Sequence, residues 1–212
     1  MLYSVSIIQY GVDQTRFFLM SEVKFGSDGD FSDKAMILKV NANLANELGN
    51  LCQRTLSMVH KNCDKAVPPI MREYTAEDLA LLDNARNLRQ KAAEFVAVQA
   101  IEKYVEILVS MIWETNKYID TMAPWVLRKT DPERMATVLY VIMEVLRYSA
   151  ILYQPLIPNS ANKILDLLTI PADERTFAHL TDDYKIKAGT PICKPEGIFP
   201  RIELPADLLV EA

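Results

Sequence analysis

The chain has 212 residues, half of them hydrophobic, and a formal net charge of −5 at neutral pH. This length and composition exclude a disordered protein and allow one large or two small domains with a sizeable core. No apolar run approaches the ~20 residues of a membrane-spanning helix, and the N-terminus lacks the pattern of a signal peptide. Three cysteines without a Cys-x-x-Cys pair suit a reducing compartment and argue against a zinc site.

The first predicted element is a short helix through residues 16–20, which Asp13 can cap. A turn rich in Gly and Asp follows at 25–30, and we expect the first thirty residues to form a small mixed unit. A long helix then begins near residue 32 and runs to about 62, because its apolar residues recur three and four positions apart.

The next helical region begins after two prolines, where Thr75 starts a capping sequence. Apolar residues keep the same spacing from Leu81 to Ile119. So long a span predicts two helices with a break within residues 90–98, and Pro124 ends the second one.

Asp131 is placed to cap a further helix, with Pro132 at its first position and a buried apolar stripe as far as Leu152. A short helix through 164–168 follows, and residues 181–203 are expected to form an extended tail. Several helices with narrow apolar seams and short links predict an all-α helical bundle.

Trp125 is the aromatic residue with the most informative position. Most tryptophans are largely buried, so one interpretation is an apolar plug that closes the end of the bundle. The other is a rigid aromatic platform, because Pro124 stops the helix and fixes the backbone just before the indole. Trp113 lies beside the apolar seam of the preceding helix and is expected in the core.

Amide and guanidinium side chains gather on one side of the helix of residues 32–62. At about 100° per residue, one line at the edge of the apolar face holds Asn43, Asn46, Asn50 and Arg54. A solvated face is the first interpretation. The second is base reading, because Asn and Arg make bidentate contacts with base edges and Arg also stacks. This helix has four basic and two acidic residues, whereas residues 75–114 have four basic and seven acidic residues. The negative charge of the chain therefore lies away from the candidate face.

Three basic residues follow the aromatic corner, and they could contact phosphates or be solvated: Arg128, Lys129 and Arg134. His60 and His179 are isolated, without partners at metal-ligand spacing. The chain shows no Ser-His-Asp set, no Gly-rich phosphate loop and no zinc-protease helix, so no catalytic or metal residue is predicted. A flat ring, an amide and a guanidinium are instead the groups that read an unpaired RNA base.

Three parts of the chain resemble the C-terminal half of methionyl-tRNA synthetases. They are the stretch from Phe25 through the Asn-rich residues to Leu51, the Ala123–Trp125 corner, and the closing run 195–203. In the closing run the family more often has Pro-Leu where this chain has Gly197-Ile198. The resemblance covers nearly the whole chain from about Ile7, in order and at family spacing.

The resemblance implies three parts in order. Residues 1–31 form the end of a stem-contact segment, residues 32–170 form an α-helical anticodon-binding domain, and residues 171–212 form a tail that packs back toward the catalytic domain. It also implies that Asn50, Arg54 and Trp125 contact the CAU anticodon of methionine tRNA. In this scheme the indole is the stacking platform, and Pro124 sets its position.

The catalytic half of the family has no counterpart in this chain. The HIGH and KMSKS signatures, the nucleotide fold for ATP and methionine, and the zinc-bearing insertion are missing from the sequence. Whole members of the family make methionyl-adenylate and pass methionine to the tRNA. We therefore expect a cytoplasmic (or organellar) part of a methionine–tRNA ligase that holds no cofactor and is inactive alone. It would be either a fragment whose sequence starts late within a longer reading frame, or one piece of a naturally split enzyme. The alternatives are a free-standing protein-interaction or tRNA-binding module and a free-standing ligase.

Overall fold

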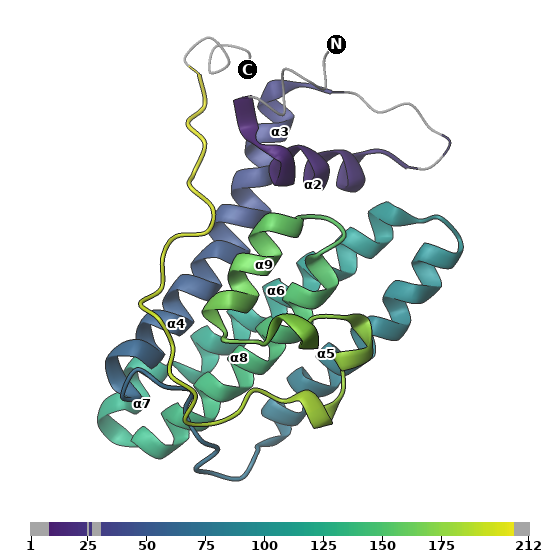
Figure 1. Ribbon diagram of the computed structural model, residues 1–212. Coiled ribbons are helices and arrows are strands. Elements are labelled where there is room, and N and C mark those ends of the chain that lie inside the picture. Colours follow the sequence, from purple (N-terminus) through teal and green to yellow (C-terminus); the bar gives the residue numbers. More distant parts are fainter. Residues whose placement is uncertain (1–8, 25, 27–30, 206–212) are drawn as a thin grey trace.

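The computed structural model of the protein describes residues 9–24, 26 and 31–205 (Figure 1). Within these residues the chain is helical, with a single isolated bridge between Ala66 and Pro191, which confirms the all-α prediction. The α-helices are α2 (Val12–Glu22), α3 (Asp33–Val40), α4 (Asn50–Asn62), α5 (Ala76–Ala97), α6 (Ile101–Met122), α7 (Pro124–Thr130), α8 (Pro132–Tyr153) and α9 (Pro158–Leu167). The other helical elements are the π-helix η1 (Asn41–Gly49) and the 3₁₀ turns η2 (Ala172–Glu174), η3 (Phe177–His179) and η4 (Asp182–Tyr184).

Helix α8 is the centre of the bundle, and α4, α5, α6, α7 and α9 all pack against it. It begins as predicted, with Pro132 in its first turn and the Asp131 side chain accepting a hydrogen bond from the Arg134 N–H. The prediction of one buried stripe is wrong, because every residue from 135 to 153 is buried. By length and composition α8 could cross a membrane, but 94% of its apolar window is buried, as in the core helix of a bundle.

Helices α5 and α6 form a hairpin that packs against α8. The predicted cap at Thr75 is confirmed as a capping box, in which its hydroxyl accepts from the Asp78 N–H. The break between the two helices falls at residues 98–100, at and just beyond the end of the predicted window. Gln99 has a φ of 60°, so a left-handed residue makes the turn without Gly or Pro.

The N-terminal region packs on the bundle through α2, which contacts α3, α6 and α9. The first thirty residues were predicted to form a mixed unit, and the described residues among them are mainly helical. Most of the predicted turn at 25–30 lies outside the described residues. Asp13 does not cap α2, because Gly11 precedes the helix and Asp13 lies in its first turn. Its buried carboxylate accepts a 2.6 Å hydrogen bond from the Ser160 N–H and so ties α2 to α9.

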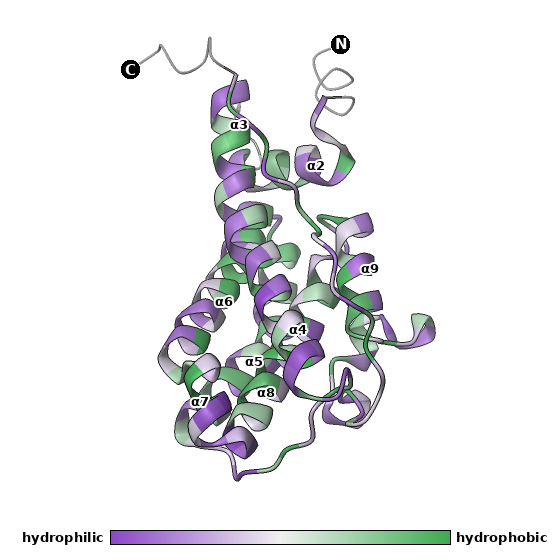
Figure 2. Cartoon of the chain, turned by 90° about the vertical axis from the view of Figure 1, so that its left-hand side faces the viewer, coloured by the Kyte–Doolittle hydropathy of each residue, from purple (hydrophilic) through white to green (hydrophobic). Residues whose placement is uncertain are grey.

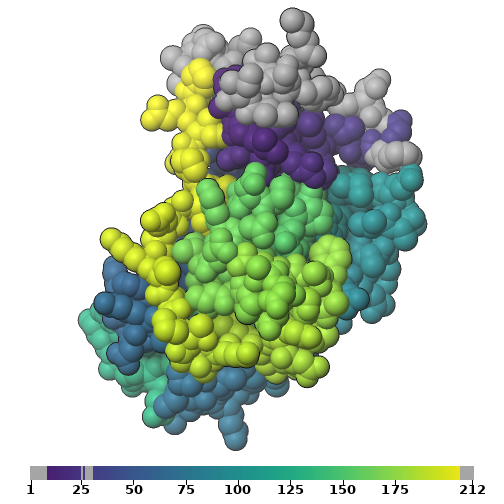
Figure 3. Space-filling view, in the orientation of Figure 1, coloured from purple at the N-terminus to yellow at the C-terminus, as the bar shows by residue number. Residues whose placement is uncertain are grey.

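The tail returns along the outside of the bundle and runs beside α4 and α3 toward α2 (Figures 1 and 3). A buried pair on α8 holds its first part: Arg147 binds Glu144 and donates to the carbonyl oxygen of His179 at 2.8 Å. Glu144 also accepts from the Ile186 N–H at 3.1 Å. The predicted extended tail is therefore interrupted by η4, and buried side chains of α8 fix its course.

Candidate nucleic-acid interface

The long helix predicted from residue 32 to 62 is present, but it changes its geometry in the middle. Helices α3 and α4 are α-helical, whereas the nine residues of η1 form a π-helix. A π-helix closes its hydrogen bonds five residues along, so side chains four or five positions apart align. The predicted line at 100° per residue is therefore wrong within η1, and Asn41, Asn46 and Asn50 come into alignment instead. The Asn43 amide donates to the carbonyl of Lys39 at 2.9 Å.

The corner between α6 and α7 presents an aromatic ring. Ala123 ends α6 in the left-handed region, with φ 44° and ψ 60°, and Pro124 is buried in the first turn of α7. The next residue, Trp125, remains 41% exposed, so it is not a buried plug. The local geometry is that of a rigid corner, because the proline fixes its own φ and its side chain is packed.

Trp113 does not lie in the core, and that prediction is wrong. It is 65% exposed in the middle of α6, although the adjacent Ile112 is almost completely buried. Trp113 was expected beside the seam, but the buried residues of α6 follow one side of the helix and Trp113 faces outward.

Arg54 lies between α4 and the aromatic corner. Its guanidinium carbon is 5.3 Å from the centre of the Trp125 ring, within the range of a cation–π contact. Its Nη2 donates to Asp120 Oδ1 at 2.7 Å, and the arginine side chain is 32% exposed. One carboxylate and one ring thus orient the guanidinium, while other donors of the fork make no hydrogen bond with the described residues.

Asn50 lies one turn before Arg54 on α4, and its side chain is exposed. It borders a groove of about 340 Å³ between the long helix and the tail. The groove is lined by Ala45, Asn46, Gly49, Asn50, Gln53, Gly197, Ile198 and Phe199. Figure 2 faces this side of the molecule and shows hydrophilic residues along α4 with the tail passing alongside.

The sequence did not predict that residues of the tail form one wall of this groove. Only the folded chain brings residues 197–199 against a helix 150 positions earlier, and an isolated Gly-Ile-Phe run carries no signal of that contact. Gly49 offers the one partial signal, because a Cβ there would lie 3.3 Å from the Phe199 ring and 3.0 Å from the Leu44 carbonyl. A glycine inside a helix often marks such a close approach.

The three basic residues after the corner separate into two groups. Arg128 and Lys129 are exposed in the last turn of α7 and form no ion pair within the described residues. Arg134 is a structural residue, so its inclusion among phosphate contacts is wrong. Its Nη2 donates to the buried Asp78 at 2.7 Å, and its side chain is only 12% exposed.

This ion pair stabilises the base of the corner. Burial acts to raise the pKa of Asp78, but the hydrogen bonds from Arg134 and Tyr118 outweigh it and hold the pKa below its ordinary value. Burial and the hydrogen bond to Asp78 raise the pKa of Tyr118. Asp78, Tyr118 and Arg134 come from α5, α6 and α8, so one buried network joins three helices, of which α6 and α8 contact α7.

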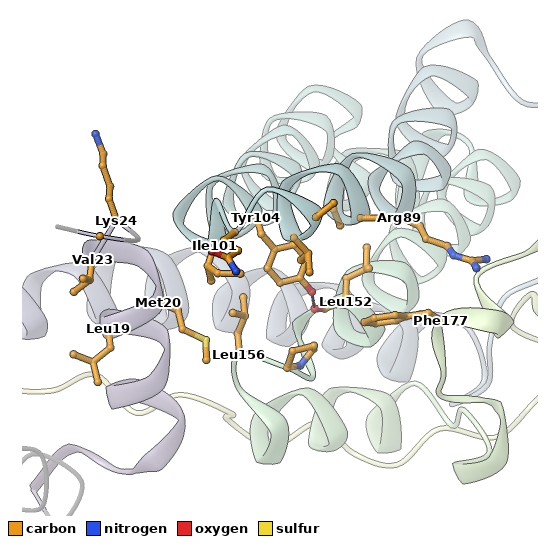
Figure 4. A pocket seen from close by; sticks show the side chains of 17 residues that line it. Leu19, Met20, Val23, Lys24, Arg89, Ile101, Tyr104, Leu152, Leu156 and Phe177 are labelled. Atoms are coloured by element: carbon orange, nitrogen blue, oxygen red, sulfur yellow. Dashed lines mark hydrogen bonds between the residues drawn. The ribbon is translucent and has the colours of Figure 1, made fainter.

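A larger hollow of about 1120 Å³ lies at the other end of the bundle, between α2 and the α5–α6 turn (Figure 4). Its walls are mostly apolar and include Leu19, Met20, Val96 and Leu156. Tyr104 also lines it, but its hydroxyl donates to the Leu152 carbonyl. The described residues contain no group of three or more potential metal ligands here or elsewhere.

Two family models match different parts of the chain, and the boundary between them lies between Arg54 and Trp125. Residues 68–206 match the family described as the anticodon binding domain of methionyl tRNA ligase. Residues 3–56 match the family of class I tRNA synthetases of the methionine type. The first match contains Trp125, and the second contains Asn50 and Arg54, so the site draws on both.

Similar proteins give the same result over almost the whole chain. Methionine–tRNA ligases of Rickettsia felis and Mesorhizobium japonicum are 45% and 47% identical to it over 93% and 92% of its length. The apo form of Mycobacterium tuberculosis methionyl-tRNA synthetase superimposes with a TM-score of 0.92, at 43% identity over 96% of the chain. The chain spans 38–41% of the length of these proteins.

The bundle and its matches define an anticodon-binding domain of a class I aminoacyl-tRNA synthetase. More specifically, the chain belongs to the methionyl-tRNA synthetase family.

Proposed function

We propose that the chain docks the anticodon loop of methionine tRNA as part of a bacterial, cytoplasmic methionine–tRNA ligase. The observation that carries this proposal is the exposed Trp125 ring beside the Arg54 guanidinium, with the Asn50 amide one turn away. An aromatic ring stacks on any base, whereas amide and guanidinium groups distinguish base edges. The anticodon to be read is CAU.

The roles follow from the chemistry of each group. Trp125 stacks on the first anticodon base, and Pro124 holds the ring at the corner. Arg54 and Asn50 donate to base edges. Exposed Arg128 and Lys129 contact phosphates of the loop, which are the negative charges that a small basic cluster neutralises.

In the whole enzyme, ATP and methionine would be bound by the part of the ligase that has no counterpart here. The tail would pack back toward that catalytic domain, and residues 1–31, as the end of the stem-contact segment, would join it to the anticodon-binding domain. The chain alone is then inactive. ATP–pyrophosphate exchange with methionine tests this point, and clear activity of the purified chain would contradict it.

Binding to a CAU anticodon stem-loop, measured by fluorescence anisotropy over a series of salt concentrations, tests the proposed function. We expect affinity to fall steeply with salt, and to fall less steeply after Arg128→Gln and Lys129→Gln, with a slope lower by about 1 for each lost contact. The control is a stem-loop with another anticodon, which should bind more weakly.

The alternative is a protein-interaction bundle without an RNA role. It is supported by the apolar walls of the large hollow and by the exposed Trp113. That function predicts no preference between the two stem-loops and association that does not depend on salt.

A further inference from the structure

The large hollow between α2 and the α5–α6 turn has apolar walls on two helices. The last two turns of α5 present Ala93, Val96 and Ala97, all three of which are exposed. The C-terminal half of α2 presents Leu19 and Met20, which are partly exposed. A space of about 1120 Å³ separates these walls among the described residues. Concave apolar surfaces of this kind usually mark binding sites, so the hollow suits a ligand with an apolar body.

Several polar groups in the walls of the hollow already have partners within the protein. The Tyr104 hydroxyl donates to the Leu152 carbonyl. The carbonyls of Pro155 and Leu156 accept from the Arg16 guanidinium at 2.6 and 3.3 Å. These groups therefore offer little to a sugar or another strongly polar molecule, which would lose its hydrogen bonds to water without gaining equivalent ones.

The charged side chains that line the hollow are both positive. They are Lys24 on α2 and Arg89 on α5, and no Asp or Glu lines the hollow among the described residues. This is the reverse of the whole chain, which has a net charge of −5. Neither cation makes an ion pair or a side-chain hydrogen bond within the part of the chain that the structure describes. The hollow is therefore complementary in charge to an anion.

The two cations lie at opposite ends of the hollow (Figure 4). Lys24 lies at the α2 end, and its ammonium points away from the other labelled side chains. Arg89 lies at the far end together with Phe177. A guanidinium binds both oxygens of a carboxylate through its planar fork. A carboxylate at Arg89 would leave the apolar walls toward Met20 for the rest of the same molecule.

We infer that the hollow is a binding site for a free long-chain carboxylate, in which Arg89 binds the carboxylate and the apolar walls bind the chain. The site lies at the other end of the bundle from Trp125, so it adds a class of ligand and does not extend the proposed RNA surface. A bound chain would contact both α2 and α5 and would therefore fasten the N-terminal region to the bundle.

Isothermal titration calorimetry of the full chain with sodium dodecanoate, below its micelle concentration, tests this inference. Dodecyltrimethylammonium carries the same chain with the opposite charge, and acetate carries the carboxylate without the chain. We expect saturable binding of one dodecanoate per protein, weaker binding of the cation, and none of acetate. Dodecanoate should also raise the Tm of the protein, because a ligand that binds the folded state stabilises it.

Two substitutions on α5 separate the roles of charge and space. Arg89→Gln should lower the affinity for dodecanoate about tenfold, as expected for the loss of one hydrogen-bonded charge, and should not weaken binding of the cation. Lys91→Gln is the matched control, because Lys91 is an exposed cation of the same helix that does not line the hollow. Ala93→Trp should abolish binding by filling the hollow, with an unchanged circular dichroism spectrum because Ala93 is exposed.

The outcomes separate this site from the proposed function. If dodecanoate does not bind, if the cation binds as tightly, or if Arg89→Gln and Ala93→Trp change nothing, the inference is overturned and the hollow is left to the protein-interaction alternative. Trp125→Ala should bind dodecanoate as the unmodified chain does, because the indole does not line the hollow. A failure of RNA binding therefore leaves this inference standing, and a failure of dodecanoate binding leaves the proposed function standing.

Discussion

Two arginines of this chain each have a carboxylate and an aromatic ring as neighbours, but one arginine is buried and the other is partly exposed. Arg147 pairs with Glu144 and lies 4.5 Å from the centre of the Tyr148 ring, while Arg54 pairs with Asp120 and lies 5.3 Å from the Trp125 ring. The Arg147 side chain has no exposure, whereas 32% of the Arg54 side chain is exposed.

The difference lies in how many acceptors each guanidinium has. Arg147 also binds the backbone carbonyls of His179 and Thr181, so its donors are used to hold the tail. Arg54 has one carboxylate and keeps donors for another molecule. The same pairing of guanidinium, carboxylate and ring therefore serves as a structural joint in the core and as a recognition group at the surface.

The largest effect should come from breaking the buried joint. Arg147→Ala leaves Glu144 buried without its partner, and we expect a loss of ~3–5 kcal/mol in the free energy of unfolding. Urea unfolding followed by circular dichroism measures it. Arg86→Ala is the control, because that surface arginine pairs with exposed carboxylates and should cost less than about 1 kcal/mol. Equal losses would show that burial does not distinguish the two kinds of pair.

The buried network beneath the corner should make stability depend on acid pH. The pKa of Asp78 is lower in the folded protein than its ordinary value of 3.8, so its ionised form stabilises the fold above that value. This contribution is lost as the pH falls through the folded pKa. We expect Tm to drop below about pH 4, and to drop less steeply in Asp78→Asn. Parallel Tm profiles for the two proteins would contradict this role of Asp78.

The exposed ring should matter for binding and little for folding. Trp125→Ala should weaken binding of the CAU stem-loop by ~1–3 kcal/mol, the usual value of a base–aromatic stack. Isothermal titration calorimetry measures the affinity, and thermal unfolding checks the fold. Unchanged affinity in a folded variant would remove the ring from the proposed site.

The smallest effect should come from changing the shape of the exposed cation while keeping its charge. Arg54→Lys should weaken RNA binding by about 1 kcal/mol, because an ammonium cannot replace the planar fork at a base edge. Stability should be unchanged, since the pair with Asp120 is largely exposed. A variant that binds as tightly as the original would mean that Arg54 acts through charge alone.

The sequence predicted the features that depend on local chemistry. The capping box at Thr75 and the Asp131–Pro132 start of α8 each rest on a few adjacent residues, so they could be located without the fold. The features that were wrong depend on distant contacts. The π-helix runs beside the tail that Asn41 and Gly49 hold, and a helix wheel assumes α-geometry throughout.

Burial was the other quantity that the sequence could not supply. Trp113 lies next to a buried seam residue yet faces outward, whereas Arg134 lies near exposed cations yet pairs with a buried carboxylate. In both cases the outcome depends on which helix covers that side. The candidate residues Asn50, Arg54 and Trp125 were found because their chemistry matched a known family, and the structure then placed Arg54 against the ring.

The central claim is that the exposed corner reads the first anticodon base. Fluorescence titration of a Trp113→Phe variant, in which Trp125 is the remaining tryptophan, tests it most directly. We predict quenching by a CAU stem-loop and little response to one with the first anticodon base changed. Equal quenching by both RNAs, or none by either, would contradict the claim.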